Sequence, residues 1–391
     1  MNILIFNYEY PPVGGGGGVV NSLVAEELAR RHRVCVVTSA FADLPRREVR
    51  GGVEILRVPV LSRHDASAAS LLSLLSYPPS AWIAGTRLLL REHFDVINTH
   101  FVVPSGPASL PLAWLAGIPQ VLSLHGGDIY DPSKRLSPHR SRLLRAVVTT
   151  ILRHSTVVIA QSRNTRDNVY RYYRYKGSIE LVPLGIRQRA TAPMTRGSLG
   201  LPENAFLAVT VGRLVRRKRV DVLLRALAQP PCEAIHLAVV GSGPESEVLQ
   251  RLANELGIAE RVQFLGRVDE ARKWQTLRAS DAYVSSTMHE GFGLSYLEAM
   301  ASGLPIVTPN YGGQVDFLRD GETGYLVPPG EVDGLAAAIG RLRDNPELAA
   351  HIGHTNQERA PQFRIERCAE AYEHLLQLAC TRIHATSPAA A

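Results

Sequence analysis

Two glutamates flank a glycine-rich turn in the second half of the chain. Glu290 precedes the turn, and Glu298 lies eight positions later, about two helical turns into a predicted helix. The free amides at the start of such a helix suit a phosphate, and the two acids could then hold hydroxyls on a sugar and on a ribose. Alternatively, the first acid complements a helix dipole and the second is solvated. The turn and helix start comprise Gly291, Phe292, Gly293, Leu294 and Ser295.

Two basic residues follow another predicted strand, 207–212. Arg213 and Lys218 lie five positions apart across a turn, so a guanidinium and an ammonium could bind two phosphates there. Such a pair would neutralise a departing diphosphate. The neighbouring arginines are expected to lie in water, and they are Arg216, Arg217 and Arg219.

A histidine and an aspartate follow the predicted strand 120–124. His125 and Asp128 enclose two glycines at the carboxyl end of that strand, where ligands bind in open α/β sheets. The histidine could donate to a sugar hydroxyl, and the aspartate could orient an acceptor hydroxyl. A structural role for a histidine at a strand end is the alternative.

Five consecutive glycines, 14–18, separate the first predicted strand from the first predicted helix. Their amides are exposed, and their backbone can approach an anion closely. A dinucleotide-binding fingerprint would require a glycine at Val19, so that motif is matched only in part. A flexible turn is the alternative interpretation.

Strand-like and helix-like runs alternate through nearly the whole chain, which predicts doubly wound parallel sheets of the α/β class. A stretch with little periodicity, 187–202, predicts a linker, so we expect one domain over 1–190 and a second over 191–364. Strands are predicted at 3–7, 34–38, 53–59, 95–99, 120–124, 156–160 and 179–182, and then at 207–212, 235–240, 262–265, 282–285, 306–308 and 324–327. The helices predicted in the first half are 19–31, 80–92, 105–116, 137–153 and 164–173.

These motifs follow one another in the order of a known enzyme family. The run from Glu290 to Glu298, with Gly-Phe-Gly after the first acid and Glu-Ala-Met-Ala around the second, resembles the family 4 retaining glycosyltransferases of the GT-B fold. The resemblance implies two Rossmann-like domains facing a central cleft, the first for the acceptor and the second for a nucleoside-diphosphate sugar. It also implies a C-terminal helix, about 365–380, that packs back on the first domain. Further matching segments are 303–307, 312–313 and 324–327.

The resemblance implies roles for individual residues. Arg213 and Lys218 would stabilise the leaving diphosphate. Glu290 would position the donor sugar, Glu298 would hold the ribose, and His125 would stabilise the sugar near the reacting carbon. The candidate catalytic residues are therefore His125, Asp128, Arg213, Lys218 and Glu290. The other residues implied at the donor site are Gly15, Gly16, Gly17, Gly241, Gly266, Arg267 and Val268.

Two segments depart from the family pattern. The family commonly has Asn-Gly-Val-Asp where this chain has Pro183-Leu184-Gly185-Ile186-Arg187, which predicts a different handling of the acceptor. Asp316 stands where a glutamate is more usual, so the acid is kept.

Composition restricts the class of protein. A chain of 391 residues with 45% hydrophobic and 20% charged residues predicts about two to three globular domains. The start of the chain is a poor signal peptide, and prolines interrupt the most apolar window, 102–121, which argues against a membrane-spanning helix. The four cysteines have no metal-like spacing and predict a reduced, cytoplasmic protein. Because the chain contains no Asp-x-Asp triplet, we expect neither a metal nor a further cofactor.

Positive charge is concentrated in the first half. Residues 1–190 contain 23 Lys and Arg against 13 Asp and Glu, whereas the remainder contains 20 against 23. This favours an anionic partner such as a lipid-linked acceptor or a membrane surface, although solubility alone would also explain it. The segment 134–176 could lie on anionic lipid from the cytoplasmic side, or its helix could simply pack on the sheet. No nucleic-acid motif accompanies it.

The favoured function is transfer of a glucosyl- or mannosyl-type hexose from a UDP- or GDP-linked donor to a hydroxyl of a glycan or lipid-linked acceptor, with retention and without metal. A nucleotide-sugar epimerase or a phosphorylase would use the same fold. A dehydrogenase and a noncatalytic sugar- or membrane-binding protein are alternatives of other classes.

Overall fold

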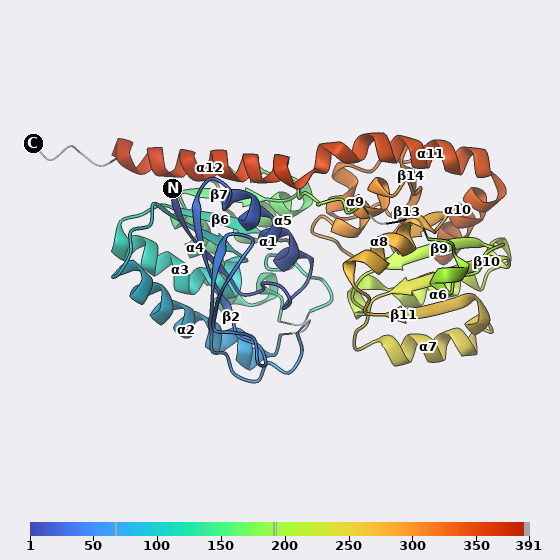
Figure 1. The fold of residues 1–391 in the computed structure, drawn as a ribbon, viewed down its shortest axis with the longest axis horizontal. Helices are drawn as coiled ribbons and strands as arrows, with labels where there is room; N and C mark the ends of the chain where they lie inside the picture. Colours follow the sequence, from blue (N-terminus) through green and yellow to red (C-terminus); the bar gives the residue numbers. More distant parts are fainter. Residues whose placement is uncertain (67–68, 135, 191, 193, 387–391) are drawn as a thin grey trace, which may run out of the picture. The chain divides into compact units, whose positions relative to one another are not determined.

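The computed structural model describes residues 1–66, 69–134, 136–190, 192 and 194–386. Arg135 of the basic segment and Thr191, the first residue of the predicted second domain, lie outside these ranges. The chain forms two compact units (Figure 1): Met1–Gly185 with the chain from Ile365 onward, and Ile186–Arg364. Over the described ranges, no helix combines the length and the apolar character needed to cross a membrane.

The first unit is built on an eight-stranded sheet with the order β3-β4-β2-β1-β5-β6-β7-β8. All neighbouring strands are parallel except β3 and β4. The central strands are apolar and buried on both faces, as parallel strands covered by helices must be. The strands are β1 (Asn2–Asn7), β2 (Arg33–Ser39), β3 (Arg47–Arg50), β4 (Val53–Val58), β5 (Val96–His100), β6 (Gln120–Leu124), β7 (Val157–Ala160) and β8 (Glu180–Leu181).

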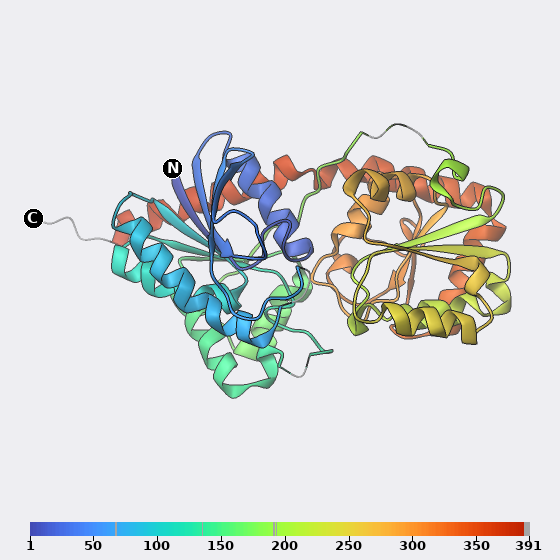
Figure 2. The same ribbon diagram turned by 60° about the horizontal axis from the view of Figure 1, so that its bottom comes forward.

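Helices cover both faces of this sheet. α2, α3 and α4 lie side by side on one face (Figures 1 and 2), and their apolar side chains join two buried clusters with the strands. α1 and α12 contact each other, and α12 also packs on β5 and β6. The helices are α1 (Gly16–Leu28), α2 (Leu71–Leu89), α3 (Val102–Ala116), α4 (Arg142–His154), α5 (Arg163–Tyr173) and α12 (Ile365–Thr386).

Three local predictions for this unit were wrong. α2 begins at Leu71 and contains Pro78 and Pro79, whereas the sequence prediction began the helix after these prolines. β3 was not predicted, because its charged, largely exposed residues have no apolar alternation. α4 begins at Arg142 with Ser141 as its N-cap, and the preceding residues form only a short 3-10 turn, Pro138–Arg140.

The second unit is built on a six-stranded, wholly parallel sheet with the order β11-β10-β9-β12-β13-β14. Apolar side chains of α6, α7 and α10 form one buried cluster with the strands. The strands are β9 (Phe206–Val211), β10 (Ile235–Val240), β11 (Val262–Gly266), β12 (Ala282–Val284), β13 (Ile306–Pro309) and β14 (Gly324–Val327). The helices are α6 (Val220–Leu227), α7 (Ser246–Glu255), α8 (Glu270–Arg278), α9 (Leu294–Ala301), α10 (Val332–Asp344) and α11 (Pro346–Arg359).

Each sheet reverses its direction of winding at one place. In the first unit β1 lies between β2 and β5, and in the second unit β9 lies between β10 and β12. Ligands of doubly wound sheets bind at the carboxyl ends of the strands beside such a reversal. The predicted α/β class with two doubly wound parallel sheets is confirmed.

Candidate active site

The reversal point of the second unit brings two loops together. The loop after β9 forms a 3-10 turn at Arg216–Lys218, and the loop after β12 leads to Glu290. Two backbone-directed bonds join the loops: Met288 N donates to Arg217 O at 2.9 Å, and Thr287 Oγ1 donates to the same oxygen at 3.3 Å. The predicted cation and the predicted acid therefore meet although they are far apart in sequence.

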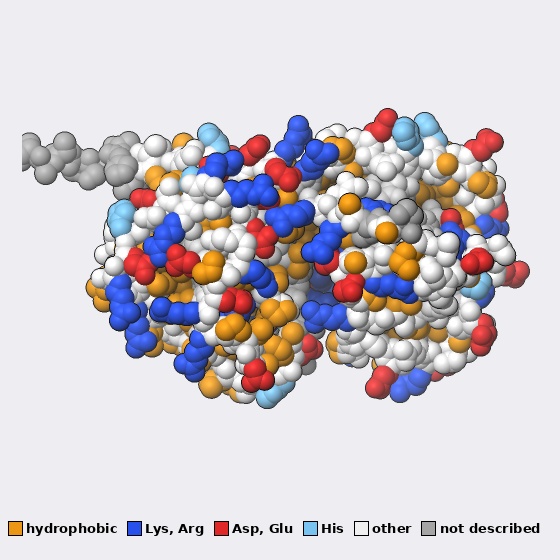
Figure 3. Space-filling view, in the orientation of Figure 1, with side chains coloured by type: hydrophobic (Ala, Val, Ile, Leu, Met, Phe, Trp, Pro, Cys, Tyr) orange, Lys and Arg blue, Asp and Glu red, His pale blue; other side chains and the backbone are white. Residues whose placement is uncertain are grey.

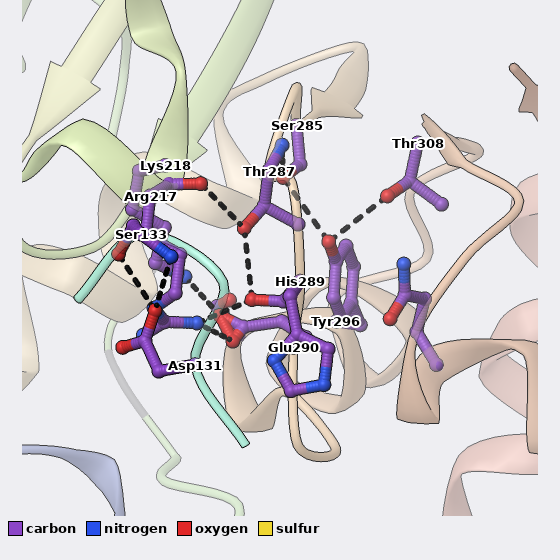
Figure 4. Close-up of polar contacts among 12 residues, drawn as sticks. Asp131, Ser133, Arg217, Lys218, Ser285, Thr287, His289, Glu290, Tyr296 and Thr308 are labelled. Carbon is purple, nitrogen blue, oxygen red and sulfur yellow. Dashed lines mark hydrogen bonds and ion pairs between the residues drawn. The ribbon is translucent and has the colours of Figure 1, made fainter. Parts of the chain in front are cut away.

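Glu290 is held by two cations (Figure 4). Lys218 Nζ donates to its Oε1, and Arg217 Nη1 donates to its Oε2 at 3.1 Å. Arg217 also donates to the carbonyl of His289. Arg217 was expected to lie in water, but its side chain is only 21% exposed because it pairs with this buried acid. By contrast, Arg216 is 84% exposed, as predicted.

The environment keeps Glu290 ionised. Burial alone would raise the pKa of this carboxyl, but Lys218 and Arg217 outweigh it and lower the pKa to about 2. Burial and the neighbouring Arg217 lower the pKa of the Lys218 ammonium, although Glu290 opposes that shift. The site therefore contains a buried, charged acceptor group with cations on one side of it.

Buried hydroxyls and glycines fix the loop that carries Glu290. The Tyr296 hydroxyl lies 2.9 Å from Thr308 Oγ1 and donates to Ser285 Oγ at 3.1 Å (Figure 4). A Cβ on Gly313 would lie 1.9 Å from the carbonyl oxygen of Gly291, so only glycine permits this approach of the two loops.

The start of α9 offers backbone amides without a side-chain cap. Gly293 is its N-cap, with φ +99°, and the helix proper begins at Leu294. Ser295 Oγ accepts from the hydroxyl of Tyr283 at 2.8 Å. Phe292 is buried against Phe317, with ring centroids 4.8 Å apart, so its backbone rather than its ring is accessible to a ligand.

Glu298 has a partner that the sequence did not indicate. Lys273 Nζ of α8 donates to Glu298 Oε1 at 2.7 Å and to Glu270 Oε1 at 2.9 Å. Burial raises the pKa of Glu298, and Lys273 opposes that shift. No spacing rule joins these two helices, so Lys273 could not have been found from the sequence.

The remaining predicted donor residues lie at the ends of β9, β10 and β11. Gly241 N donates to Gly266 O at 2.8 Å, and a Cβ on Gly241 would lie 1.9 Å from Gly212 O. Arg267 is exposed and Val268 is half-buried. Arg213 lines a small pocket with Thr210, Val211, Gly212, Leu214, Lys218, Val220 and Ser285.

The first unit brings together the other predicted residues at its own reversal point. The amide of Gly15 donates to Glu9 Oε2 at 2.8 Å, and α1 begins at Gly16. A Cβ on Gly17 would lie 2.5 Å from Phe101 Cζ and 3.4 Å from His125 Nδ1. Phe101 itself has φ +64°, a strained conformation for a bulky residue.

His125 is bonded to a second histidine that sequence reasoning missed. Asn98 Nδ2 donates to the Val121 carbonyl at 3.1 Å, so its Oδ1 faces His100 Nε2 at 2.7 Å and must accept from it. His100 Nδ1 is then the acceptor at its 2.9 Å contact with His125 Nε2. The Nδ1 atom of His125 is therefore unprotonated, and it is buried without a partner among the described atoms.

Burial keeps both rings neutral, lowering the pKa of His125 to about 3 and that of His100 well below its ordinary value. In this tautomer the free nitrogen of His125 accepts a hydrogen bond, whereas the sequence analysis expected His125 to donate to a sugar hydroxyl. His125 was predicted as a site residue because ligands bind at the carboxyl ends of parallel strands, and it follows β6. The same rule would also have identified His100 at the end of β5.

Asp128 shapes the loop in which His125 lies. Its Oδ1 accepts from His125 N at 2.9 Å, and its Oδ2 accepts from Val102 N at 2.8 Å. Burial raises the pKa of Asp128 to about 6, although these amides oppose the shift. Both oxygens are thus already engaged with the backbone.

Within the described ranges, no group of three or more His, Cys, Asp or Glu residues is arranged to hold a metal ion. The two reversal points contain cations, the ionised Glu290, glycine turns and the neutral His125. Each Rossmann-like unit thus has its own cluster of predicted site residues at its reversal point.

Fold and site define a GT-B glycosyltransferase. The model described as "Glycosyltransferase Family 4" matches residues 14–189, and the model described as "Glycosyl transferases group 1" matches residues 193–359. The chain belongs to glycosyltransferase family 4, as the motif order predicted.

Several known proteins are similar along almost their whole length. N-acetyl-alpha-D-glucosaminyl L-malate synthase of Bacillus anthracis is 29% identical, over 93% of this chain and 94% of that protein. A GDP-mannose-dependent alpha-(1-6)-phosphatidylinositol monomannoside mannosyltransferase of Mycolicibacterium smegmatis is 28% identical, over 90% of this chain and 91% of that protein. Sucrose-phosphate synthase of Thermosynechococcus elongatus has the same fold, with a TM-score of 0.84 at 24% identity over 99% and 100% of the two chains. The Anabaena protein HepE in complex with UDP-glucose has a TM-score of 0.77 at 22% identity, over 96% of this chain and 99% of HepE.

Proposed function

We propose that this chain is a retaining, metal-independent glycosyltransferase that moves a hexosyl group of glucosyl or mannosyl type from a nucleoside-diphosphate sugar to an acceptor hydroxyl. The observation that carries the proposal is the buried carboxylate of Glu290, held ionised by Lys218 and Arg217 beside the uncapped start of α9. An ionised carboxylate accepts strongly from sugar hydroxyls, while cations and helix amides favour a diphosphate.

In the proposed reaction, the bond from the anomeric carbon to the diphosphate oxygen breaks and a bond to the acceptor oxygen forms on the same face. The acceptor proton passes to the departing phosphate, so no covalent nucleophile is needed. Arg213, Lys218 and the amides at Gly293 and Leu294 stabilise the charge that develops on the leaving diphosphate. Glu290 orients the sugar so that the two oxygens meet on one face.

Glu298 and Lys273 serve the nucleotide end of the donor in this proposal. A carboxylate that is buried and paired can accept from both ribose hydroxyls, and Lys273 opposes the rise in its pKa that burial causes. The backbone near Gly241, Gly266 and Val268 would meet the base. The proposed base is uracil or guanine, because HepE was solved with UDP-glucose and the mycolicibacterial relative is GDP-mannose-dependent.

The first unit serves the sugar and the acceptor. The bare Nδ1 of His125 would accept from a hydroxyl of the transferred sugar, and Gly17 leaves the space for it. We propose an anionic acceptor, part of a lipid-linked or cell-envelope glycan, because the first 190 residues have a large excess of basic residues. Malate, inositol 3-phosphate and phosphatidylinositol occur in the names of relatives, which supports an anionic acceptor. A cytoplasmic location is part of the same proposal.

The first test is binding of UDP, GDP, ADP, their sugar conjugates and NAD by thermal shift, with and without EDTA. One nucleoside diphosphate should raise the midpoint with EDTA present, by an amount set by its concentration relative to Kd. Arg213→Ala should abolish the shift, whereas Arg216→Ala, which changes an exposed arginine, should leave it intact. A shift with NAD alone would instead support a dehydrogenase.

The second test follows the donor that binds. Incubation with candidate acceptors should give a glycoside with the anomeric configuration of the donor, as read by proton NMR. Conversion of the donor sugar without acceptor would support an epimerase, and release of sugar 1-phosphate would support a phosphorylase. Inverted product would contradict retention.

A further inference from the structure

An open groove of about 410 Å³ lies between α4 and α5 of the first unit. The two helices lie side by side in green tones in Figure 2. The groove is lined by Arg145, Ala146, Thr149, Thr150, Arg153, Tyr172, Tyr173 and Arg174.

All charged side chains that line the groove are basic. Among the described residues, Arg145, Arg153 and Arg174 make no ion pair and no side-chain hydrogen bond, and α4 contains no acid. On the face of this unit visible in Figure 3, by contrast, acidic side chains lie between the basic ones. Three like charges around one groove repel one another, and a bound anion would remove that repulsion.

The three arginines come from well-separated positions. Arg145 and Arg153 are two helical turns apart on α4, about 12 Å along its axis. Arg174 ends α5 in the left-handed conformation, with φ +49°, where glycine or asparagine is usual. A non-glycine residue in this conformation is strained, so the position carries a large cation at some conformational cost.

Neutral donors complete the groove. The hydroxyls of Thr149 and Thr150 make no hydrogen bond to another described residue that would compete with a ligand. Tyr172 forms an ordered wall, because its ring stacks on that of Tyr130 with centroids 5.2 Å apart. Guanidinium groups bind phosphate oxygens bidentately, and each threonine hydroxyl can add a single hydrogen bond.

We propose that this groove is an anion site for a phosphate ester, separate from the diphosphate site of the second unit. Two sources supply that group: the headgroup of an anionic phospholipid, or a soluble phosphorylated ligand. The end of α4 nearest Arg153 also has exposed apolar neighbours, since His154 contacts the ring of Trp114, which is 56% exposed, and Leu115 beside it is 76% exposed. Such side chains insert at the headgroup level of a bilayer.

The test compares two variants of the full chain with equal loss of charge. One replaces Arg145, Arg153 and Arg174 by glutamine. The control replaces Arg46, Arg47 and Arg91, three exposed arginines of the same unit. Thermal melts establish that both are folded. Flotation is measured with vesicles of phosphatidylcholine containing about 30 mol% phosphatidylglycerol at about 0.15 M salt, and glycerol 3-phosphate binding is measured by calorimetry.

We expect the native chain to bind one of the two probes, and the groove variant to bind it more than tenfold more weakly, with less than a twofold change in the control. Vesicle binding identifies a lipid source, and glycerol 3-phosphate binding identifies a soluble one. The proposal is overturned if neither probe binds, or if both variants lose binding equally, because the effect would then be one of net charge alone. Donor binding by the groove variant, measured separately, tests the proposed transferase function independently.

Discussion

His100 determines which nitrogen of His125 carries a proton. His100 Nδ1 and His125 Nε2 are 2.9 Å apart. Asn98 is oriented by the carbonyl of Val121, and it makes His100 the acceptor of the bond between the two rings. His125 therefore presents a bare Nδ1 on the side of Gly17. A ligand group that meets this nitrogen must be a donor such as a hydroxyl, and a carboxylate there would be rejected.

Replacement of His100 should therefore impair the reaction through His125. In His100→Phe the ring still stacks near Tyr372, but the tautomer of His125 is no longer fixed. We expect kcat/KM for the donor to fall about 10- to 100-fold, with nitrogen-15 NMR showing a mixture of His125 tautomers in place of the Nε2–H form alone. His354→Phe, at an exposed histidine, is the control. An unchanged tautomer signal would show that His100 does not position His125.

The stability of the first unit should decrease in acid because of His125. Burial lowers its pKa from 6.5 to about 3, so the unfolded chain binds more protons than the folded one between these values. The free energy of unfolding therefore falls as pH drops through this window. Urea denaturation at several pH values should show this slope in the native chain and a reduced slope in His125→Gln. Equal slopes in the two proteins would assign the acid sensitivity to other groups.

Glu290→Gln should separate an enzyme from a noncatalytic binding protein. The change leaves Lys218 and Arg217 beside a neutral amide, which should reduce transfer by about 10²–10³-fold and stability by about 3 kcal/mol. Initial rates and urea denaturation measure the two effects. Glu245→Gln, whose partner is the exposed Arg216, is the matched control and should change neither by much. Unaltered function in Glu290→Gln would rule out the proposed role.

The same ion pairs predict acid sensitivity in the second unit. The pKa of Glu290 falls from 4.5 to about 2 on folding, so its contribution is complete above the first value and is lost as pH falls toward the second. Glu290→Gln should flatten the dependence of the unfolding free energy on pH over that range. A slope identical to that of the native chain would mean that Glu290 is not the group responsible.

The candidate site residues could be predicted from the sequence where they follow predicted parallel strands, and they were missed where other features position them. Parallel strands place their carboxyl ends at one edge, so residues after predicted strands, such as His125 and Glu290, could be expected to form sites. The pairing of Lys273 with Glu298 depends on how two helices pack, which no local pattern reports. Arg217 was placed in water because a run of basic residues does not show which member turns inward.

Lys273 should control how donor binding depends on pH. Burial raises the pKa of Glu298 and Lys273 opposes it, so Lys273→Met should raise that pKa further, and Glu298 should take up a proton at a higher pH than in the native chain. As pH falls, binding of the nucleoside diphosphate should therefore weaken at a higher pH in Lys273→Met than in the native chain. Calorimetry at several pH values measures the Kd of both proteins, and Lys273→Arg should restore the native behaviour. A flat profile in Lys273→Met would exclude Glu298 from ribose binding.

Gly17 should be needed for space rather than for backbone freedom. A Cβ there would lie 2.5 Å from Phe101 Cζ and within contact distance of His125 Nδ1, so Gly17→Ala should move either ring and impair the sugar site. We expect transfer to fall about tenfold or more, with a loss of stability of about 1–3 kcal/mol. Gly127→Ala lies in the neighbouring loop where a Cβ meets nothing within 4 Å, and it should remain close to native. Recovery of activity in the double variant Gly17→Ala/Phe101→Leu would locate the clash at Phe101. Equal loss in both single alanine variants would instead indicate that these loops need glycine for flexibility.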